Sequence, residues 1–285
     1  MQKNRGISQM GYKIIASDLD GTLFNNQGVI SKQNYEAIEK LNNFNVHFVP
    51  ASGRSFEEMP KELKNCPFIR YYIGSDGGTV YDKVANITHQ LALPTELGHY
   101  VLDKLYQYPI NMMLHADNNS YVDADMHTAD DYHSYNYNDR WVEFVMSTNT
   151  PIKNFKTFAY EKQSIELFCV FFQNHDDLLE CKEFFEKHPD LLVAQSDKYN
   201  LEIFWKNAGK GNALLLLAEI LGVDAKDTIA VGDSTNDSTM VKAAGLGLAM
   251  DNAVSELKEI ADAIICDNDN HSTNYILENY IKSNI

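Results

Sequence analysis

Short apolar strands alternate with amphipathic helices at both ends of the chain, and this alternation restricts the fold more than any other feature of the sequence. Near the N-terminus the expected strands are residues 12–17 and 46–50, and the helix between them begins after Ser31, which can cap it. A further helix is expected to run through Met59 and Leu63. Strands and helices in this order form a parallel sheet covered by helices on both faces.

The C-terminal end repeats this order. Strands are expected at residues 228–231, 247–250 and 263–266, and helices at residues 213–221, 237–244 and 254–261. The first of these helices carries a stripe of leucines and stops at Gly222. We therefore expect an α/β fold, with a Rossmann-like three-layer core built on a parallel sheet.

The middle of the chain has a different pattern. It combines a helix near residues 96–106 with antiparallel-looking strands near 111–115, 164–172 and 199–205. A third strand at 71–73 and a hairpin at 79–81 and 87–93 precede it. This pattern predicts an inserted α+β cap domain over residues 94–207, with the catalytic core formed by residues 1–93 and 208–285.

The acidic composition limits the partners of the chain. Its formal net charge is −16 and no run of Lys or Arg offsets it, so nucleic acids and anionic membranes would repel it. No stretch approaches the roughly 18 apolar residues of a membrane span, and the four scattered cysteines favour reduced thiols. We expect a cytoplasmic protein without an obligate protein partner, preceded by a short leader over residues 1–10.

Two carboxylates separated by one residue follow the first expected strand, in the segment Asp18-Leu19-Asp20-Gly21-Thr22. Ligands of open α/β sheets bind outside the carboxyl ends of the strands. One carboxylate there can attack phosphorus while the other protonates the leaving alcohol and later deprotonates water. Gly21 permits the turn and, with Thr22, offers amides to an oxyanion. Taken alone, the segment is also compatible with an ordinary Asp-Gly turn.

Two further segments offer contacts to a phosphate. Ser52-Gly53-Arg54 follows the second strand and supplies a hydroxyl and a backbone amide. Lys210 precedes an expected helix, so its ammonium and the helix N-terminus both attract an anion. A plain loop and a solvated surface lysine are the alternative interpretations of these segments.

The strand at residues 228–231 leads into Gly-Asp-Ser-Thr-Asn-Asp at residues 232–237. Alone, this segment is also compatible with the capped start of a helix. Together, however, Asp18, Asp20, Asp233 and Asp237 would place four carboxylates at one edge of the sheet. Their mutual repulsion requires a hard divalent cation between them. Mg²⁺ is the natural ion for such oxygen ligands.

These segments, in this order, resemble the four motifs of haloacid dehalogenase (HAD) superfamily phosphatases. The likeness is closest to the Cof-type branch, which places its cap between the second and third motifs, where the inserted segment lies here. Residues 247–253, Gly-Leu-Ala-Met-Asp-Asn-Ala, resemble a further stretch of that branch. Two segments depart from it. Asp76-Gly77-Gly78 stands where the family commonly has Asn-Gly, and residues 267–272 lack the usual Glu/Asp-Asp-Gly ending.

The resemblance implies a role for each matching residue. Asp18 would be the nucleophile and a metal ligand, and Asp20 the acid/base that also lends its backbone carbonyl to the metal. Asp233 would complete the protein ligands of Mg²⁺. The residues that would hold the phosphate are Ser52, Gly53, Lys210 and Asn236, and the supporting residues are Gly21, Thr22, Arg54 and Asp237.

The expected activity is a Mg²⁺-dependent phosphatase that hydrolyses a small phosphorylated metabolite, a sugar phosphate or a phosphorylated cofactor, through an aspartyl-phosphate. Two alternatives stay open at this point. One is a phosphotransferase or mutase that shares the aspartyl-phosphate step, and the other is a sensor that binds a phosphometabolite without turnover. Release of phosphate separates the hydrolase from the sensor.

The inserted segment gives fewer indications of function than the core motifs do. Its aromatic residues are expected to pack on each other rather than on a ligand, namely Tyr121, Tyr132, Tyr135, Tyr137 and Trp141. The acidic run with histidines at residues 123–133 is interpreted as a solvated loop rather than a second metal site. Asn111, His115 and Glu202 lie on expected strands and are candidates for contacting the leaving group.

Overall fold

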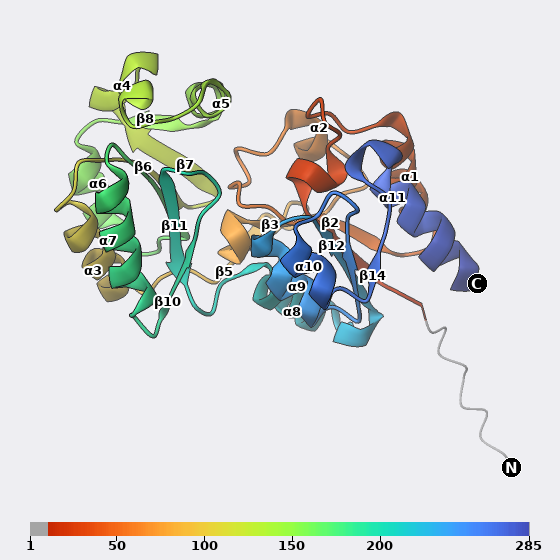
Figure 1. Ribbon diagram of the computed structural model, residues 1–285. Helices are drawn as coiled ribbons and strands as arrows, with labels where there is room; N and C mark the ends of the chain where they lie inside the picture. The colour runs from red at the N-terminus through yellow and green to blue at the C-terminus, as the bar shows by residue number, and fades with distance from the viewer. Residues whose placement is uncertain (1–10, 285) are drawn as a thin grey trace, which may run out of the picture. The chain divides into compact units, whose positions relative to one another are not determined.

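The computed structural model describes residues 11–284, and these form two compact units (Figure 1). The described part of the first unit comprises residues 11–50, 68–70 and 214–284, and the second unit comprises residues 51–67 and 71–213. The boundaries of the two compact units differ from those expected for the core and the cap. The division into a catalytic core and a cap domain stays a prediction. The expected leader lies outside the described residues.

A five-stranded parallel sheet lies at the centre of the first unit, with the order β14-β13-β12-β1-β2. Its central strand β1 (Ile14–Ser17) pairs with β2 (His47–Pro50) on one side and with β12 (Thr228–Gly232) on the other. Strands β13 (Leu246–Ala249) and β14 (Ala263–Ile264) complete it. The expected parallel α/β fold is therefore confirmed, although the last strand is shorter than predicted.

The connections of this sheet determine where its helices lie. From β1 the chain moves outward to β2 through α1 (Lys32–Asn42), whereas from β12 it moves the opposite way through α9 (Ser238–Ala243) and α10 (Ser255–Ile260). Right-handed crossovers therefore place α1 on one face and α9 and α10 on the other, as Figure 1 shows. The order reverses between β1 and β12, and ligand sites of open sheets form at the carboxyl ends of such strands.

Helix α1 begins where its sequence predicts. The Ser31 hydroxyl oxygen accepts a hydrogen bond from the backbone N–H of Asn34 at 3.2 Å. The helix buries Ala37, Ile38 and Leu41, and α11 (Ser272–Ile276) packs beside it.

Replacing Ser31 by alanine removes this cap, and we expect the free energy of unfolding to fall by about 1 kcal/mol. Ser31→Asp is the matched control, because aspartate accepts the same hydrogen bond and also favours a helix N-terminus. Denaturant unfolding of the two variants measures the difference. Equal losses in both would show that the cap contributes nothing at this position.

The second unit is built on a six-stranded sheet with the order β10-β11-β9-β6-β7-β8. All of its pairs are antiparallel except β7 with β8. The strands are β6 (Ile110–Ala116), β7 (Asn119–Asp123), β8 (Thr150–Ile152), β9 (Leu167–Phe172), β10 (Leu191–Ala194) and β11 (Asn200–Trp205). Its helices are α3 (Thr95–Leu105), α4 (Ala129–Ser134), α5 (Asp139–Thr148), α6 (Phe155–Glu161) and α7 (His175–Glu186).

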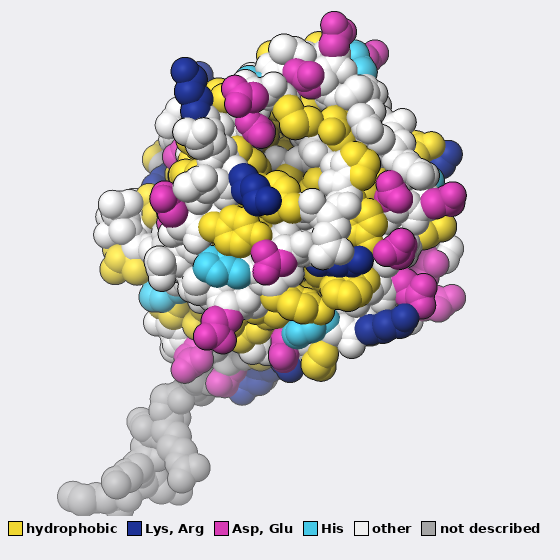
Figure 2. Space-filling model, turned by 90° about the vertical axis from the view of Figure 1, so that its left-hand side faces the viewer, with side chains coloured by type: hydrophobic (Ala, Val, Ile, Leu, Met, Phe, Trp, Pro, Cys, Tyr) yellow, Lys and Arg dark blue, Asp and Glu magenta, His cyan; other side chains and the backbone are white. Residues whose placement is uncertain are grey.

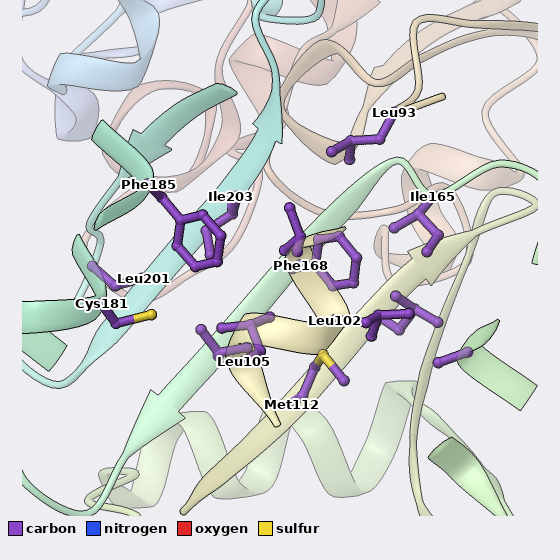
Figure 3. Packing of buried hydrophobic residues seen from close by; sticks show 14 of the residues in the cluster. Leu93, Leu102, Leu105, Met112, Ile165, Phe168, Cys181, Phe185, Leu201 and Ile203 are labelled. Atoms are coloured by element: carbon purple, nitrogen blue, oxygen red, sulfur yellow. The ribbon is translucent and has the colours of Figure 1, made fainter. Parts of the chain in front are cut away.

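Figure 3 shows the main core of this unit, in which side chains of two helices meet those of the central strands. Leu102 and Leu105 come from α3 and Phe185 from α7, and they lie around Phe168 of β9. All four are fully buried. This apolar layer holds the strands that carry the polar residues of the sheet's other face.

The outer surface of the second unit mixes charged and apolar side chains, as Figure 2 shows. The Lys104 ammonium lies 4.7 Å from the ring centroids of both Tyr108 and Phe184. Lysines thus cover part of the apolar surface while keeping their charge in water. Within residues 11–284, no helix has the length and apolar character needed to cross a membrane.

The second unit also contains a smaller antiparallel sheet of β3 (Tyr71–Gly74), β4 (Thr79–Asp82) and β5 (Ile87–Gln90). The helix expected through Met59 was a wrong prediction. Helix α2 spans only Lys61–Lys64 and begins after Pro60, whereas Met59 lies in a turn. A proline disfavours helical backbone at the residue before it, so the helix cannot extend back through Met59.

Candidate active site

Asp18 extends from the carboxyl end of the central strand β1. Its backbone N–H donates to the Val231 carbonyl of β12 at 3.0 Å, and the Ser17 hydroxyl donates to its own carbonyl at 2.9 Å. The residue is only 6% exposed. The neighbouring strand thus fixes the backbone of Asp18, while its carboxylate lies at the edge where the sheet order reverses.

Asp233 and Asp237 join Asp18 from the loop that follows β12. Asp18, Asp233 and Asp237 each offer a carboxylate oxygen within 4.8 Å of the others, and no other such group occurs within residues 11–284. Oδ2 of Asp237 accepts the backbone N–H groups of Asp233 at 3.0 Å and Ser234 at 3.1 Å. These bonds fix the loop so that three like charges converge, which favours a bound cation.

Gly21 permits the close approach of Asp233. It has a φ of +81° within the turn Leu19–Leu23, and a Cβ atom there would lie 2.3 Å from a carboxylate oxygen of Asp233. Both the backbone conformation and the contact exclude a side chain. The Thr22 hydroxyl donates to the other carboxylate oxygen of Asp233 at 3.4 Å.

Three side chains from distant segments hold the carbonyl groups of this turn. The amide of Asn252 donates to the Gly21 carbonyl at 2.8 Å, and the Ser272 hydroxyl donates to the Thr22 carbonyl at 2.9 Å. Asn34 of α1 donates to the Leu23 carbonyl at 3.3 Å. Their sequence positions did not predict this role, although Asn252 lies in the stretch 247–253 that resembles the Cof-type branch.

Asp20 and Asn236 lie in the same unit as the three carboxylates. Asp20 occupies the turn after Asp18 and is half-buried. Asn236 lies in the short helical turn Thr235–Asp237, where its amide oxygen accepts the Ser234 hydroxyl at 2.6 Å. The first unit therefore holds seven of the predicted site residues, namely Asp18, Asp20, Gly21, Thr22, Asp233, Asn236 and Asp237.

The remaining predicted site residues, Ser52, Gly53, Arg54 and Lys210, belong to the second unit. Ser52 is 3% exposed, and its hydroxyl oxygen accepts the backbone N–H of Arg54 at 3.3 Å. Lys210 is fully buried at the first turn of α8 (Lys210–Leu221), which corrects the alternative of a solvated surface lysine. Burial of an ammonium is costly without compensating charge.

A turn at Ser75–Gly77 brings these two segments together. The backbone N–H of Asp76 donates to the Ser52 carbonyl at 3.1 Å, and the N–H of Ser75 donates to the Arg54 carbonyl at 2.9 Å. A Cβ atom on Gly77 would lie 2.7 Å from the backbone nitrogen of Lys210. The turn therefore contacts both the Ser52–Arg54 segment and the start of α8. It includes the Asp-Gly pair that departs from the family pattern.

The other candidates of the inserted segment have structural partners. The Asn111 amide oxygen accepts the Tyr137 hydroxyl at 2.9 Å, and the Tyr137 ring stacks on Phe171 with centroids 3.7 Å apart. Asp123 caps a short helical turn and Asp131 completes a capping box at α4. Helices and caps thus replace the solvated loop expected over residues 123–133.

The side chain of Glu202 has a raised pKa. It lies on β11, is 8% exposed, and accepts the Ser196 hydroxyl at 2.5 Å. Burial, with the charge of Asp76 as the next cause, raises the pKa of Glu202 to about 8. The second unit therefore contains a buried carboxyl group whose environment favours its protonated form.

Comparisons with known proteins are consistent over nearly the whole chain. Residues 15–277 match the haloacid dehalogenase-like hydrolase family. The chain is 30% identical over 280 residues to 5-amino-6-(5-phospho-D-ribitylamino)uracil phosphatase YwtE of Bacillus subtilis, covering 93% of this chain and 97% of the relative. It is 28% identical over 258 residues to the HMP-PP phosphatase of Yersinia pestis, covering 87% of each chain.

Solved structures show the same fold. A haloacid dehalogenase-like hydrolase from B. subtilis superimposes with a TM-score of 0.78 at 25% identity, covering 94% of this chain and 100% of that one. A sugar phosphatase of HAD subclass IIB has a TM-score of 0.76 at 18% identity, covering 96% of this chain and 100% of that one.

A parallel sheet with converging carboxylates at its carboxyl edge is typical of an α/β enzyme that binds its ligand there. The chain belongs to the haloacid dehalogenase-like hydrolase family, as its ordered motifs predicted. The relatives named above are phosphatases.

Proposed function

We propose that this protein is a Mg²⁺-dependent phosphatase that hydrolyses a small phosphorylated metabolite through an aspartyl-phosphate. The observation that carries the proposal is the convergence of Asp18, Asp233 and Asp237 within 4.8 Å at the carboxyl edge of a parallel sheet. Membership of a hydrolase family whose relatives are named phosphatases supports the same activity.

The donor set fits a magnesium ion. Asp18 and Asp233, with the backbone carbonyl of Asp20, are the proposed protein ligands, and all three offer the hard oxygen atoms that Mg²⁺ prefers. Asp237 supports them through its bonds to the backbone of residues 233 and 234. When bound, Mg²⁺ neutralises charge on the carboxylates and on the phosphate oxygens.

In the first step, a carboxylate oxygen of Asp18 attacks phosphorus and the bond from phosphorus to the ester oxygen breaks. Asp20 gives its proton to the departing oxygen, so that an alcohol leaves. In the second step, Asp20 takes a proton from water while the water oxygen attacks phosphorus. Inorganic phosphate leaves and the Asp18 carboxylate is restored.

Other residues bind and orient the phosphoryl group in this proposal. We assign phosphate contacts to Thr22 and to the backbone amide of Gly21, which follow Asp18 in the turn Leu19–Leu23, and to the side-chain amide of Asn236. From the second unit we assign phosphate contacts to the Ser52 hydroxyl, the Gly53 amide and the Lys210 ammonium. Preorganised donors of this kind stabilise the charge on the transferring group without reorganisation.

Replacing Asp20 by asparagine should affect substrates according to their leaving groups. An alkyl phosphate needs a proton on its departing oxygen, so we expect its phosphoryl transfer to Asp18 to slow by roughly 10²–10⁴-fold. A nitrophenyl phosphate needs little protonation, and its transfer should slow far less. Single-turnover release of the alcohol from both substrates measures the difference. Equal losses would contradict the role of Asp20 as the general acid.

The substrate class follows the named relatives, which act on a phosphorylated ribitylaminouracil and on HMP-PP. We propose a sugar phosphate or a phosphorylated cofactor. The direct test is phosphate release from a panel of phosphorylated sugars, cofactors and nucleotides, in Mg²⁺ and in excess chelator. We expect release from sugar or cofactor phosphates in Mg²⁺ only. Release that persists in chelator would contradict metal dependence, and no release at all would favour a sensor or a transferase.

A further inference from the structure

A buried network of polar contacts in the second unit has His115 at its centre. His115 lies on β6 and is 3% exposed. Its Nδ1 lies 3.2 Å from the Ser75 hydroxyl oxygen, and its Nε2 lies 3.4 Å from a carboxylate oxygen of Glu58. The Ser75 hydroxyl donates to Glu166 at 2.8 Å. These four side chains come from separate segments of the chain, and each is at most 3% exposed.

Glu58 and Ser75, the two side chains that His115 contacts, both support segments assigned to phosphate binding. The carboxylate oxygen of Glu58 that faces His115 also accepts the backbone N–H of Ser55 at 2.7 Å, and so it closes the turn directly after Ser52–Arg54. Ser75 belongs to the turn that contacts both Arg54 and, through Gly77, the start of α8. One histidine on the six-stranded sheet therefore contacts both supports of the Ser52–Arg54 segment.

Glu166 makes further hydrogen bonds to this network and to the backbone around it. Its carboxylate accepts the backbone N–H of Asn118 at 2.9 Å in addition to the Ser75 hydroxyl. Its own backbone N–H donates to the His115 carbonyl at 2.8 Å. A Cβ atom on Gly78 would lie 3.0 Å from the Cβ of Glu166, so Glu166 also packs against the end of the Ser75–Gly77 turn.

The two ring nitrogens of His115 have different partners. Since the Ser75 hydroxyl donates its proton to Glu166, Nδ1 of His115 donates to the Ser75 oxygen. Nε2 faces the Glu58 carboxylate. Burial raises the pKa of the Glu166 carboxyl group.

We propose that His115 is a positioning residue for phosphoryl transfer, which holds the Ser52–Arg54 segment and the Ser75–Gly77 turn through Glu58 and Ser75. The proposal rests on the proposed function, because it takes Ser52, Gly53 and Lys210 as the phosphate contacts. His115 itself does not contact the substrate in this proposal. Its removal should therefore weaken binding of any phosphate, whatever group the phosphate carries.

Substitutions at His115 can separate its two contacts. Asparagine places an amide N–H near the position of Nδ1 and can keep the hydrogen bond to Ser75, whereas glutamine reaches the position of Nε2 and can keep the contact with Glu58. Alanine keeps neither. His99→Asn is the matched control, because His99 lies in the same unit and makes one hydrogen bond, from Nε2 to the Tyr160 carbonyl at 2.9 Å.

The experiment measures kcat and KM for a nitrophenyl phosphate and the inhibition constant of inorganic phosphate, at a temperature where circular dichroism shows each variant to be folded. We expect both KM and the inhibition constant to rise at least about tenfold in His115→Ala, with intermediate values in His115→Asn and His115→Gln. His99→Asn should match the wild type. In a double-mutant cycle, His115→Ala and Ser75→Ala should be non-additive because they act through one network.

The outcomes separate the two proposals. Failure of the wild type both to release phosphate and to bind it would overturn the proposed function, and this inference with it. An active wild type whose His115 variants lose thermal stability but keep the wild-type inhibition constant would overturn the inference alone. So would additive effects of the His115 and Ser75 substitutions, or losses in His99→Asn that equal those in His115→Ala.

Discussion

Asp18→Asn is expected to lower phosphate release by roughly 10⁴-fold or more, because the substitution removes the attacking oxygen and leaves a nearly isosteric amide. The fold should survive. Asp18 is one of three converging carboxylates, so replacing it also removes like-charge repulsion. In chelator, the variant should therefore be at least as stable as the wild type. Steady-state phosphate release and thermal unfolding, measured on the same samples, check both statements.

Asp224→Asn is the control for this substitution. Asp224 is a paired surface residue that precedes the amino end of β12, whereas the site lies at the carboxyl ends of the strands. We expect its activity to equal that of the wild type. Residual turnover above about 1% in Asp18→Asn would exclude Asp18 as the nucleophile.

Glu202→Gln is expected to change how the stability of the fold depends on pH. The pKa of Glu202 is raised from 4.5 to about 8, first by burial and then by the charge of Asp76. Between these values the folded protein holds a proton that the unfolded chain has released. The wild type should therefore lose stability as pH rises from 4.5 to 8, and the loss should be a few kcal/mol in order of magnitude. The neutral amide of glutamine should remove this loss.

Denaturant unfolding at pH 5 and pH 8 measures the effect. Glu143→Gln is the control, because Glu143 is exposed on α5 of the same unit, and its pH dependence should follow the wild type. The free energy of unfolding of Glu202→Gln, relative to that of the wild type, should increase as pH rises. Parallel curves for the wild type and Glu202→Gln would show that Glu202 is ionised in the folded protein.

The sequence predicted the elements of the first unit well because their signals are local. A short apolar run followed by Asp18, or a serine that caps α1, is readable within a few residues. The three side chains that hold the turn after Asp18 are not readable in this way. Asn34, Asn252 and Ser272 are far apart in the sequence, and each makes an ordinary polar contact with a backbone carbonyl.

The second unit was harder to predict for two reasons. Its aromatic stretch mixes strand and helix residues, so β7, α4 and α5 lack a clear periodicity, although the Thr128 and Asp131 capping box was a usable signal. The Asp-Gly-Gly run at residues 76–78 indicates a turn, but the backbone conformation of Ser75–Gly77 could not be predicted. Ser75 and Asp76 adopt φ values of +51° and +50°, which residues other than glycine rarely do, and tertiary contacts impose them.

The central claim is that Asp18 carries the phosphoryl group, and acid quenching during turnover tests it most directly. Asp20→Asn should be used with a nitrophenyl phosphate, because the first step then needs little acid while the second step lacks its base. Peptide mass spectrometry should find one phosphoryl group on the peptide that contains Asp18, and none in Asp18→Asn with Asp20→Asn. A phosphoryl group on another residue, or turnover of the Asp18→Asn single variant without any phosphorylated peptide, would contradict the account.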